Sequence, residues 1–179
     1  KTLVMLGLIA FSCMICEGAM FDWSGIYFQK VVGAKDGWIG AGYTAFMCTM
    51  ATGRFVADRV VNKVGFRKTI QFSGLLIGTG LCIAVLFPSL VLSIVAFLLV
   101  GFGVSSVVPL VYSEAGKSKV MSTGKALAAV SSIGFLGFLL GPPLIGFIAG
   151  FSSLRFSFAY VALMGFIVTI IVSRLKTQV

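Results

Sequence analysis

Six long apolar runs follow one another along the chain, and short segments rich in charged residues, Gly, Pro or Ser separate them. None of the runs shows the strict alternation of a barrel strand, and each is longer than a strand needs. Because a segment in lipid must satisfy its own backbone hydrogen bonds, we expect each run to be a helix. The predicted spans cover residues 2–28, 38–60, 69–87, 90–113, 122–150 and 154–173.

Composition makes a lipid bilayer the expected solvent of these helices. Of the 179 residues, 59% are hydrophobic and 11% are charged, and the mean hydropathy is +1.10. A soluble domain has about 25% charged residues, so a soluble fold and a disordered chain are both excluded. A span takes about 20 residues, so six spans leave no room for a soluble domain. Lys1 leads directly into the first run, which lacks a signal-peptide cleavage site, and we therefore expect a segment of a longer protein.

The net charge of +9 is distributed unevenly between the two sides that six helices define. Eleven basic residues fall on the side of the two termini: Lys1, Arg54, Arg59, Lys63, Arg67, Lys68, Lys117, Lys119, Lys125, Arg174 and Lys176. Three fall on the other side: Lys30, Lys35 and Arg155. The positive-inside rule predicts that both ends are cytoplasmic, in a plasma membrane or a bacterial inner membrane. The charge therefore indicates topology rather than a nucleic-acid partner.

Residue types that carry most enzyme chemistry are scarce. The chain has no His, which removes the commonest general base and most zinc sites. Cys13 and Cys16 have the spacing of a redox pair, but they lie in the middle of an apolar run, so we interpret them as packing residues. We expect no enzyme activity, no cofactor and no metal site.

Two acids in the first run stand out. Glu17 lies about 20 Å along a helix that crosses about 30 Å of hydrocarbon, so it should lie inside the membrane. An acidic side chain there costs roughly 2.5–3.5 kcal/mol and should face protein or water. Glu17 is therefore a candidate proton carrier or solute ligand, and Asp22, nearer the surface, is a second candidate. The alternative is a structural hydrogen bond or ion pair to a neighbouring helix.

Further candidates for solute binding are aromatic or hydroxyl-bearing. Trp23 and Tyr43 lie toward the outer interface, where they form an aromatic belt or stack on a sugar-like ring. Ser105 and Ser106 lie near the middle of the fourth run. They either form hydrogen bonds between helices or line a cavity, and the sequence leaves both alternatives open.

Prolines interrupt two of the predicted helices. Pro109 lies in the fourth span, and Pro142 and Pro143 lie in the fifth. The double proline removes the helical hydrogen bonds to the carbonyls of Phe138 and Leu139. We expect either a fixed bend or a hinge whose freed carbonyls line a cavity, as in transporters.

The most specific pattern closes the second span and opens the third. It combines a Gly that permits close helix approach, an Asp-Arg pair, a Gly suited to a tight turn, and two further basic residues. These residues are Gly53, Asp58, Arg59, Gly65, Arg67 and Lys68. Topology alone explains the basic residues, but not the acid and the two glycines at these positions.

This pattern resembles motif A of the major facilitator superfamily, a loop of the form G-x-x-x-D-R-x-G-R-R between paired helices. The gap between Gly53 and Asp58 is one residue longer, and extra residues precede Gly65, as in the loop between helices eight and nine of the twelve. Residues 141–146, Gly-Pro-Pro-Leu-Ile-Gly, resemble the eleventh helix, and residues 153–156 resemble the start of the twelfth. Residues 17–24 resemble the seventh helix of the sugar-permease-like branch that includes fucose permeases.

The resemblance implies that the chain is the C-terminal half of a twelve-helix transporter, built from two inverted three-helix repeats. The first, second, fourth and fifth helices would then face a central cavity, with the third and sixth toward lipid. The motif A residues would form a conformational lock with the N-terminal six-helix half, which is absent from this chain.

The leading functional hypothesis is a secondary transporter that moves a small polar solute by proton symport and alternating access. A sugar-like molecule is one candidate for this solute. The alternative is proton-driven efflux of drugs or metabolites, which the 17 Phe residues favour. A membrane enzyme is disfavoured by the missing His. A channel or a non-transporting membrane subunit is disfavoured by the membrane acid and the prolines in a motif A bundle.

Overall fold

The computed structural model describes residues 2–175, and over this range the chain forms six long α-helices and no strand. They are α1 (Thr2–Tyr27), α2 (Ala41–Val64), α3 (Phe66–Leu86), α4 (Leu90–Gly116), α5 (Thr123–Phe151) and α6 (Leu154–Ser173). A π-helical turn, η1 (Phe28–Val32), extends α1, and a 3-10 turn, η2 (Asp36–Trp38), precedes α2. The all-helical prediction is confirmed. Lys1 and Lys176, which entered the charge count, lie outside the described residues.

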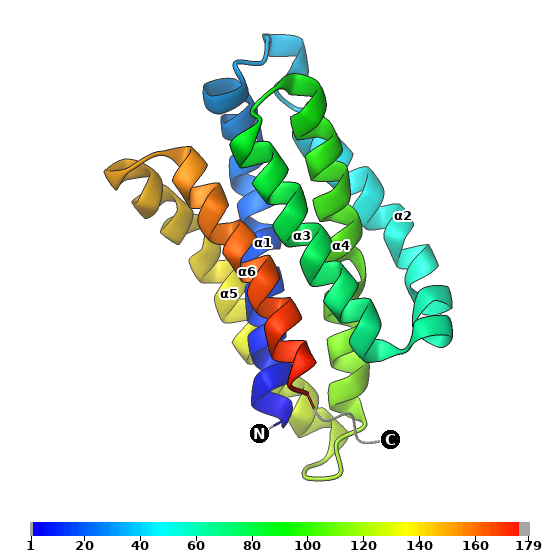
Figure 1. Cartoon of the computed structure of the whole chain (residues 1–179). Coiled ribbons are helices and arrows are strands. Elements are labelled where there is room, and N and C mark those ends of the chain that lie inside the picture. The colour runs from blue at the N-terminus through cyan, green and yellow to red at the C-terminus, as the bar shows by residue number, and fades with distance from the viewer. Residues whose placement is uncertain (1, 176–179) are drawn as a thin grey trace.

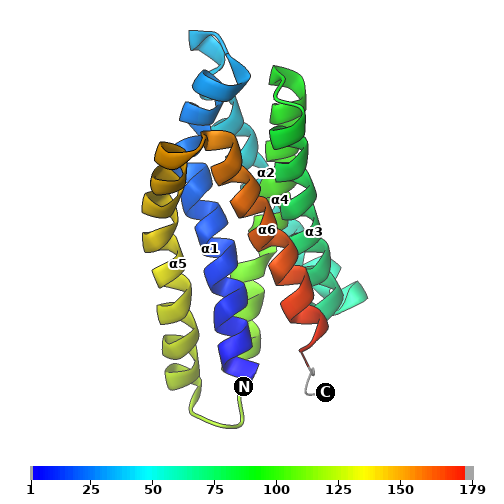
Figure 2. The ribbon, with the colours of Figure 1, turned by 60° about the vertical axis from the view of Figure 1, so that its left-hand side comes forward.

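The helices run along the long axis of one bundle, and the start of α1 and the end of α6 lie at the same end of it (Figure 1). The closest helix pairs are α1 with α5, α3 with α6, α2 with α4, and α3 with α4. Figure 2 shows α5 at one edge of the bundle, beside α1. Some helices extend past the apolar runs: α2 continues to Val64 and α4 to Gly116, because helical residues beyond the hydrocarbon can be polar.

Glycines allow the tightest of these helix pairs. On α5, Gly137 and Gly141 lie directly against the backbone of α1, and on α3, Gly74 and Gly78 lie against α6. A Cβ atom at Gly137 would overlap the backbone of Phe11. Since lipid supplies no hydrophobic drive between helices, such close backbone approach is a main source of helix association in membranes.

Five helices in the described chain are long and apolar enough to cross a membrane, namely α1 with η1, α3, α4, α5 and α6. The exception, α2, carries four charged residues in its C-terminal half: Arg54, Asp58, Arg59 and Lys63. It still packs along α4, where its Gly53 and Ala57 are buried. The helix therefore belongs to the bundle by packing, although its composition alone does not mark it as a span.

Arginines connect α3 and α6 at both ends of this antiparallel pair. Arg67, the second residue of α3, donates to the carbonyl of Ser173, the last residue of α6. Arg155, the second residue of α6, donates to the Val85 carbonyl near the end of α3, with N–O distances of 3.1 and 2.5 Å. Each guanidinium thus lies at the negative end of the partner helix dipole. The arrangement satisfies carbonyls that a helix terminus otherwise leaves free.

Candidate functional site

Glu17 lies half-buried in the middle of α1, on the helix that has most of its residues inside the bundle. The next residue, Gly18, has no side chain, so the carbonyl oxygen of Phe138 and the ring of Pro142 on α5 come close to α1. Pro142 has no N–H group to donate to the Phe138 carbonyl. A carbonyl with free acceptor capacity therefore lies beside the acidic residue, as the double-proline pattern indicated.

Glu17 interacts electrostatically with groups on two other helices. The positive charge of Arg54 on α2 acts on the Glu17 carboxylate, and the carboxylate charge acts on the Tyr112 hydroxyl of α4. No ion pair joins Glu17 to Arg54, and the one ion pair between described residues is Lys117 with Glu114, at 3.1 Å. Arg54 itself is exposed, so its side chain is free to approach or leave the acid.

The Tyr112 hydroxyl is buried and has no hydrogen-bond partner among the described residues. It lies near Gly134 of α5, and Gly134 in turn lies against Met14 of α1. Met14 is three residues from Glu17, or about one helical turn. A buried hydroxyl without a partner is costly, so such a group needs an explanation. The Glu17 carboxyl, one helical turn from Met14, is therefore a candidate partner of the Tyr112 hydroxyl.

An acid from α1, a base from α2 and a hydroxyl from α4 thus interact electrostatically, without a hydrogen bond or ion pair between them in the described residues. We call Glu17, Arg54 and Tyr112 the acid cluster. The sequence pointed to Glu17 alone, because Arg54 was interpreted as a topology signal and Tyr112 lies in an apolar run without any motif. The only available signal for Tyr112 was a Tyr near the end of a predicted span.

Asp22 and Trp23 lie one to two turns further along α1 and have different surroundings. Asp22 is exposed, and it lies about 140° around the helix from Glu17. The Trp23 indole N–H donates to the Pro142 carbonyl at 3.1 Å, and the ring packs over Gly146. Trp23 therefore connects α1 to α5. Tyr43, on α2, is 40% exposed and is not part of the acid cluster.

The two serines of α4 face the other side of the bundle, toward α2 and α3. The Ser106 hydroxyl lies 3.0 Å from that of Ser73 on α3, and Ser105 donates to the Phe102 carbonyl at 2.6 Å while packing against Gly53. Both serines also line a pocket of about 50 Å³ between these helices. The structure therefore realises both alternatives, an interhelical hydrogen bond and a small cavity, but not beside Glu17.

The motif A residues lie at the turn between α2 and α3. Gly65 makes this turn with φ +83°, a conformation that side chains rarely adopt. Asp58, Arg59 and Lys68 are exposed and make no hydrogen bond or ion pair with the described residues, whereas Arg67 binds α6. The side chains of Asp58, Arg59 and Lys68 are therefore available to bind a partner outside the described residues.

The prolines lie inside helices that remain continuous. Pro109 is exposed within α4, and Pro142 and Pro143 lie within α5. A hinge role for these prolines stays a prediction. The structure shows that the Pro142 ring packs against Gly18 and so brings α5 close to α1.

Solved transporter structures share this fold over nearly the whole chain. A peptide transporter POT in complex with sulfate matches 97% of the chain and 37% of its own, with a TM-score of 0.85 and 18% identity. The inward-open xylose transporter XylE from E. coli matches 97% of the chain and 46% of its own, with a TM-score of 0.74 and 13% identity. The fold is thus that of half of a twelve-helix transporter.

Sequence comparison gives the family. Residues 1–119 match the family model described as Major Facilitator Superfamily, and the chain belongs to this superfamily. An uncharacterised MFS-type transporter of Yersinia pestis is 38% identical over 161 residues, which cover 90% of this chain and 42% of that protein. Membrane protein MosC of Rhizobium meliloti is 36% identical over 166 residues, covering 93% and 41%. The chain therefore spans about two fifths of the length of these relatives.

Proposed function

We propose that this chain is the six-helix half of a secondary transporter that moves a small polar solute together with protons by alternating access. Family membership and relatives named as transporters support a transport function. The observation that carries proton coupling is the acid cluster, because an ionisable residue within a membrane span is costly and typically marks an ion or substrate pathway. We propose both ends of the chain to be cytoplasmic, from the distribution of basic residues.

The partner of this bundle is the other half of the transporter. The α5 helix is the least covered of the membrane helices, and a row of large apolar side chains on it is exposed. These are Phe135, Leu136, Leu139 and Leu140. We propose that part of this surface and the exposed face of α2 contact the N-terminal six-helix half, and that the free Asp58 binds that half in the outward-open state.

The test of coupling uses the full-length protein in proteoliposomes with an imposed proton gradient and a panel of pentoses, hexoses and other small polar solutes. We expect Glu17→Gln to abolish gradient-driven accumulation while solute counterflow, which needs no net proton movement, continues. Glu114→Gln is the matched control, because this acid is paired with Lys117 at the end of α4. Accumulation by Glu17→Gln equal to wild type would refute proton coupling through Glu17.

Proton-driven efflux of an apolar compound is the second candidate. The observation that favours it is the apolar sequence around Glu17 on α1, which includes Met14, Met20 and Phe21, together with the packing of Phe21 against Phe138 of α5. Inside-out vesicles distinguish the two functions, since an efflux transporter accumulates its compound there when the interior is acidic. Uptake into right-side-out vesicles under an inward proton gradient supports symport instead.

A further inference from the structure

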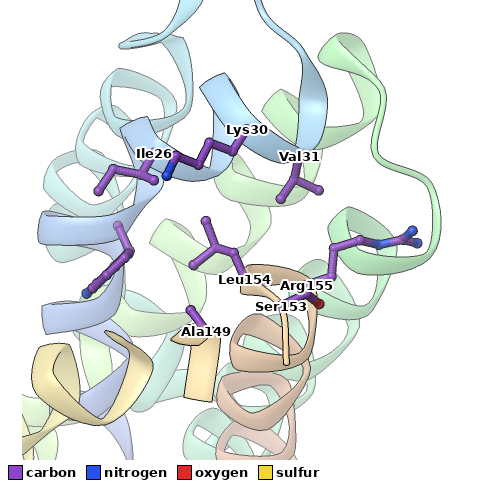
Figure 3. A pocket seen from close by; sticks show the side chains of 8 residues that line it. Ile26, Lys30, Val31, Ala149, Ser153, Leu154 and Arg155 are labelled. Atoms are coloured by element: carbon purple, nitrogen blue, oxygen red, sulfur yellow. The ribbon is translucent and has the colours of Figure 1, made fainter. Parts of the chain in front are cut away.

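A pocket of about 400 Å³ opens at the end of the bundle remote from the two termini. One wall is the outer end of α1 with η1, and the other is the turn between α5 and α6 (Figure 3). Its apolar lining includes Ile26, Ala149 and Leu154, and Trp23 also lines it. A pocket of this size, mainly apolar with few polar groups, is typical of small-molecule sites.

Lys30 is the cationic group that this pocket offers to a ligand. Figure 3 shows its side chain extending over Ile26, while the guanidinium of Arg155 points away from the pocket. Arg155 is engaged with the Val85 carbonyl. Among the described residues no acid lines the pocket, and the acids near this end, Asp22 and Asp36, are exposed outside it. The pocket therefore combines an apolar floor with the ammonium of Lys30, which makes no hydrogen bond or ion pair with the described residues, while the second cation, Arg155, is held at the Val85 carbonyl.

The helix lengths place this pocket at the boundary between acyl chains and headgroups. The 20 residues of α6 span about 30 Å, which only matches the hydrocarbon core, while the 31 residues of α1 with η1 span about 46 Å and extend past it. In Figures 1 and 2 the α5–α6 turn accordingly ends well short of the tip of α1.

The side chains at the α5–α6 turn agree with this depth. Phe147, Phe151 and Phe156 are 65%, 80% and 66% exposed on the surface of the bundle. Phe147 and Phe151 pack against each other with ring centroids 4.7 Å apart, and exposed aromatic rings of this kind are stabilised by acyl chains rather than by water. Lys30 lies on the part of α1 and η1 that extends beyond this turn, at the level where lipid phosphates lie.

We propose that this pocket binds an anionic phospholipid from the leaflet at this end of the bundle. The lipid phosphate contacts the Lys30 ammonium, and an acyl chain follows Ile26, Ala149 and Leu154 toward the phenylalanines of the turn. Because the pocket joins α1 to the α5–α6 turn, a lipid held there contacts both elements.

The experiment is native mass spectrometry of the full-length protein, released from nanodiscs that contain equal amounts of phosphatidylglycerol and phosphatidylcholine. We expect wild type to retain phosphatidylglycerol preferentially, and Lys30→Gln to lose about fivefold of this preference, the effect of one basic residue at an anionic surface. Lys30→Arg should keep it, and Lys35→Gln, which removes an exposed charge at the same end outside the pocket, is the matched control.

A second variant tests the pocket separately from the charge. Leu154→Trp fills the apolar floor and should displace the lipid although Lys30 remains. An unchanged lipid preference in both Lys30→Gln and Leu154→Trp would overturn the proposal. Loss of preference in Lys35→Gln equal to that in Lys30→Gln would also overturn it, because general surface charge would then explain the binding. Displacement of bound lipid by inorganic phosphate would assign the pocket to a free anion instead.

Discussion

Removing the arginine contacts between α3 and α6 should destabilise the bundle by an amount that the structure allows us to work out. Arg155 makes two hydrogen bonds to one carbonyl, and hydrogen bonds to charged groups are worth about 1.5–3 kcal/mol. Its side chain is exposed, so we take the low end and expect Arg155→Met to cost about 1.5 kcal/mol. Arg67→Met, which also loses its contact to one carbonyl, should cost about 1.5 kcal/mol by the same reasoning.

The two contacts lie at opposite ends of a helix pair, about 30 Å apart, so their effects should add within about 0.5 kcal/mol. The assay is reversible unfolding of the full-length protein in mixed micelles for both single variants and the double variant. Lys119→Met controls for the loss of one positive charge, because Lys119 is exposed in the α4–α5 loop, and it should change stability by less than about 0.5 kcal/mol. A double variant as stable as wild type, or no more destabilised than Arg155→Met alone, would refute the reasoning.

Three further changes should separate packing from function. Tyr112→Phe removes a costly buried hydroxyl without a partner, so it should leave the thermal midpoint unchanged or raise it but lower proton-driven transport, and equal transport would remove Tyr112 from the acid cluster. Gly137→Val drives a side chain into the α1 backbone and should cost about 3 kcal/mol or prevent folding, while Gly150→Ala, which meets open space, should be neutral in the same unfolding assay. Asp58→Asn should shift the transporter toward inward-open states, measured by labelling of cysteines introduced on both faces, and unchanged labelling would argue against the lock.

The local sequence patterns predicted the helices and the freed carbonyl of Phe138 because those features depend on a few adjacent residues. Apolar run length predicted the helices. Pro142 pointed to a carbonyl without its helical partner, and Phe138 supplies it next to Gly18. Run length predicted helix ends less well, since α2 and α4 continue into polar sequence.

Partners distant in sequence could not be predicted in this way. Trp23 was a candidate for an aromatic belt or sugar stacking, whereas its indole N–H binds the carbonyl of Pro142, 119 residues away. The pattern left open what Ser106 contacts, and the structure supplies Ser73 on another helix. Arg155 looked like one of three basic residues on the sparsely charged side, and it proves to bind the end of α3.

The sequence by itself determined that this protein has six helices, a membrane environment and both termini at one end, because hydrophobicity and segment length act locally. Tertiary structure alone decided which face of each helix meets protein. In lipid both the buried and the exposed faces are apolar, so α1 and α4 show no polar stripe from which the inner face could be read. The electrostatic interaction of Glu17 with Arg54 and Tyr112 therefore follows from the packing of three helices, and no local pattern encodes it.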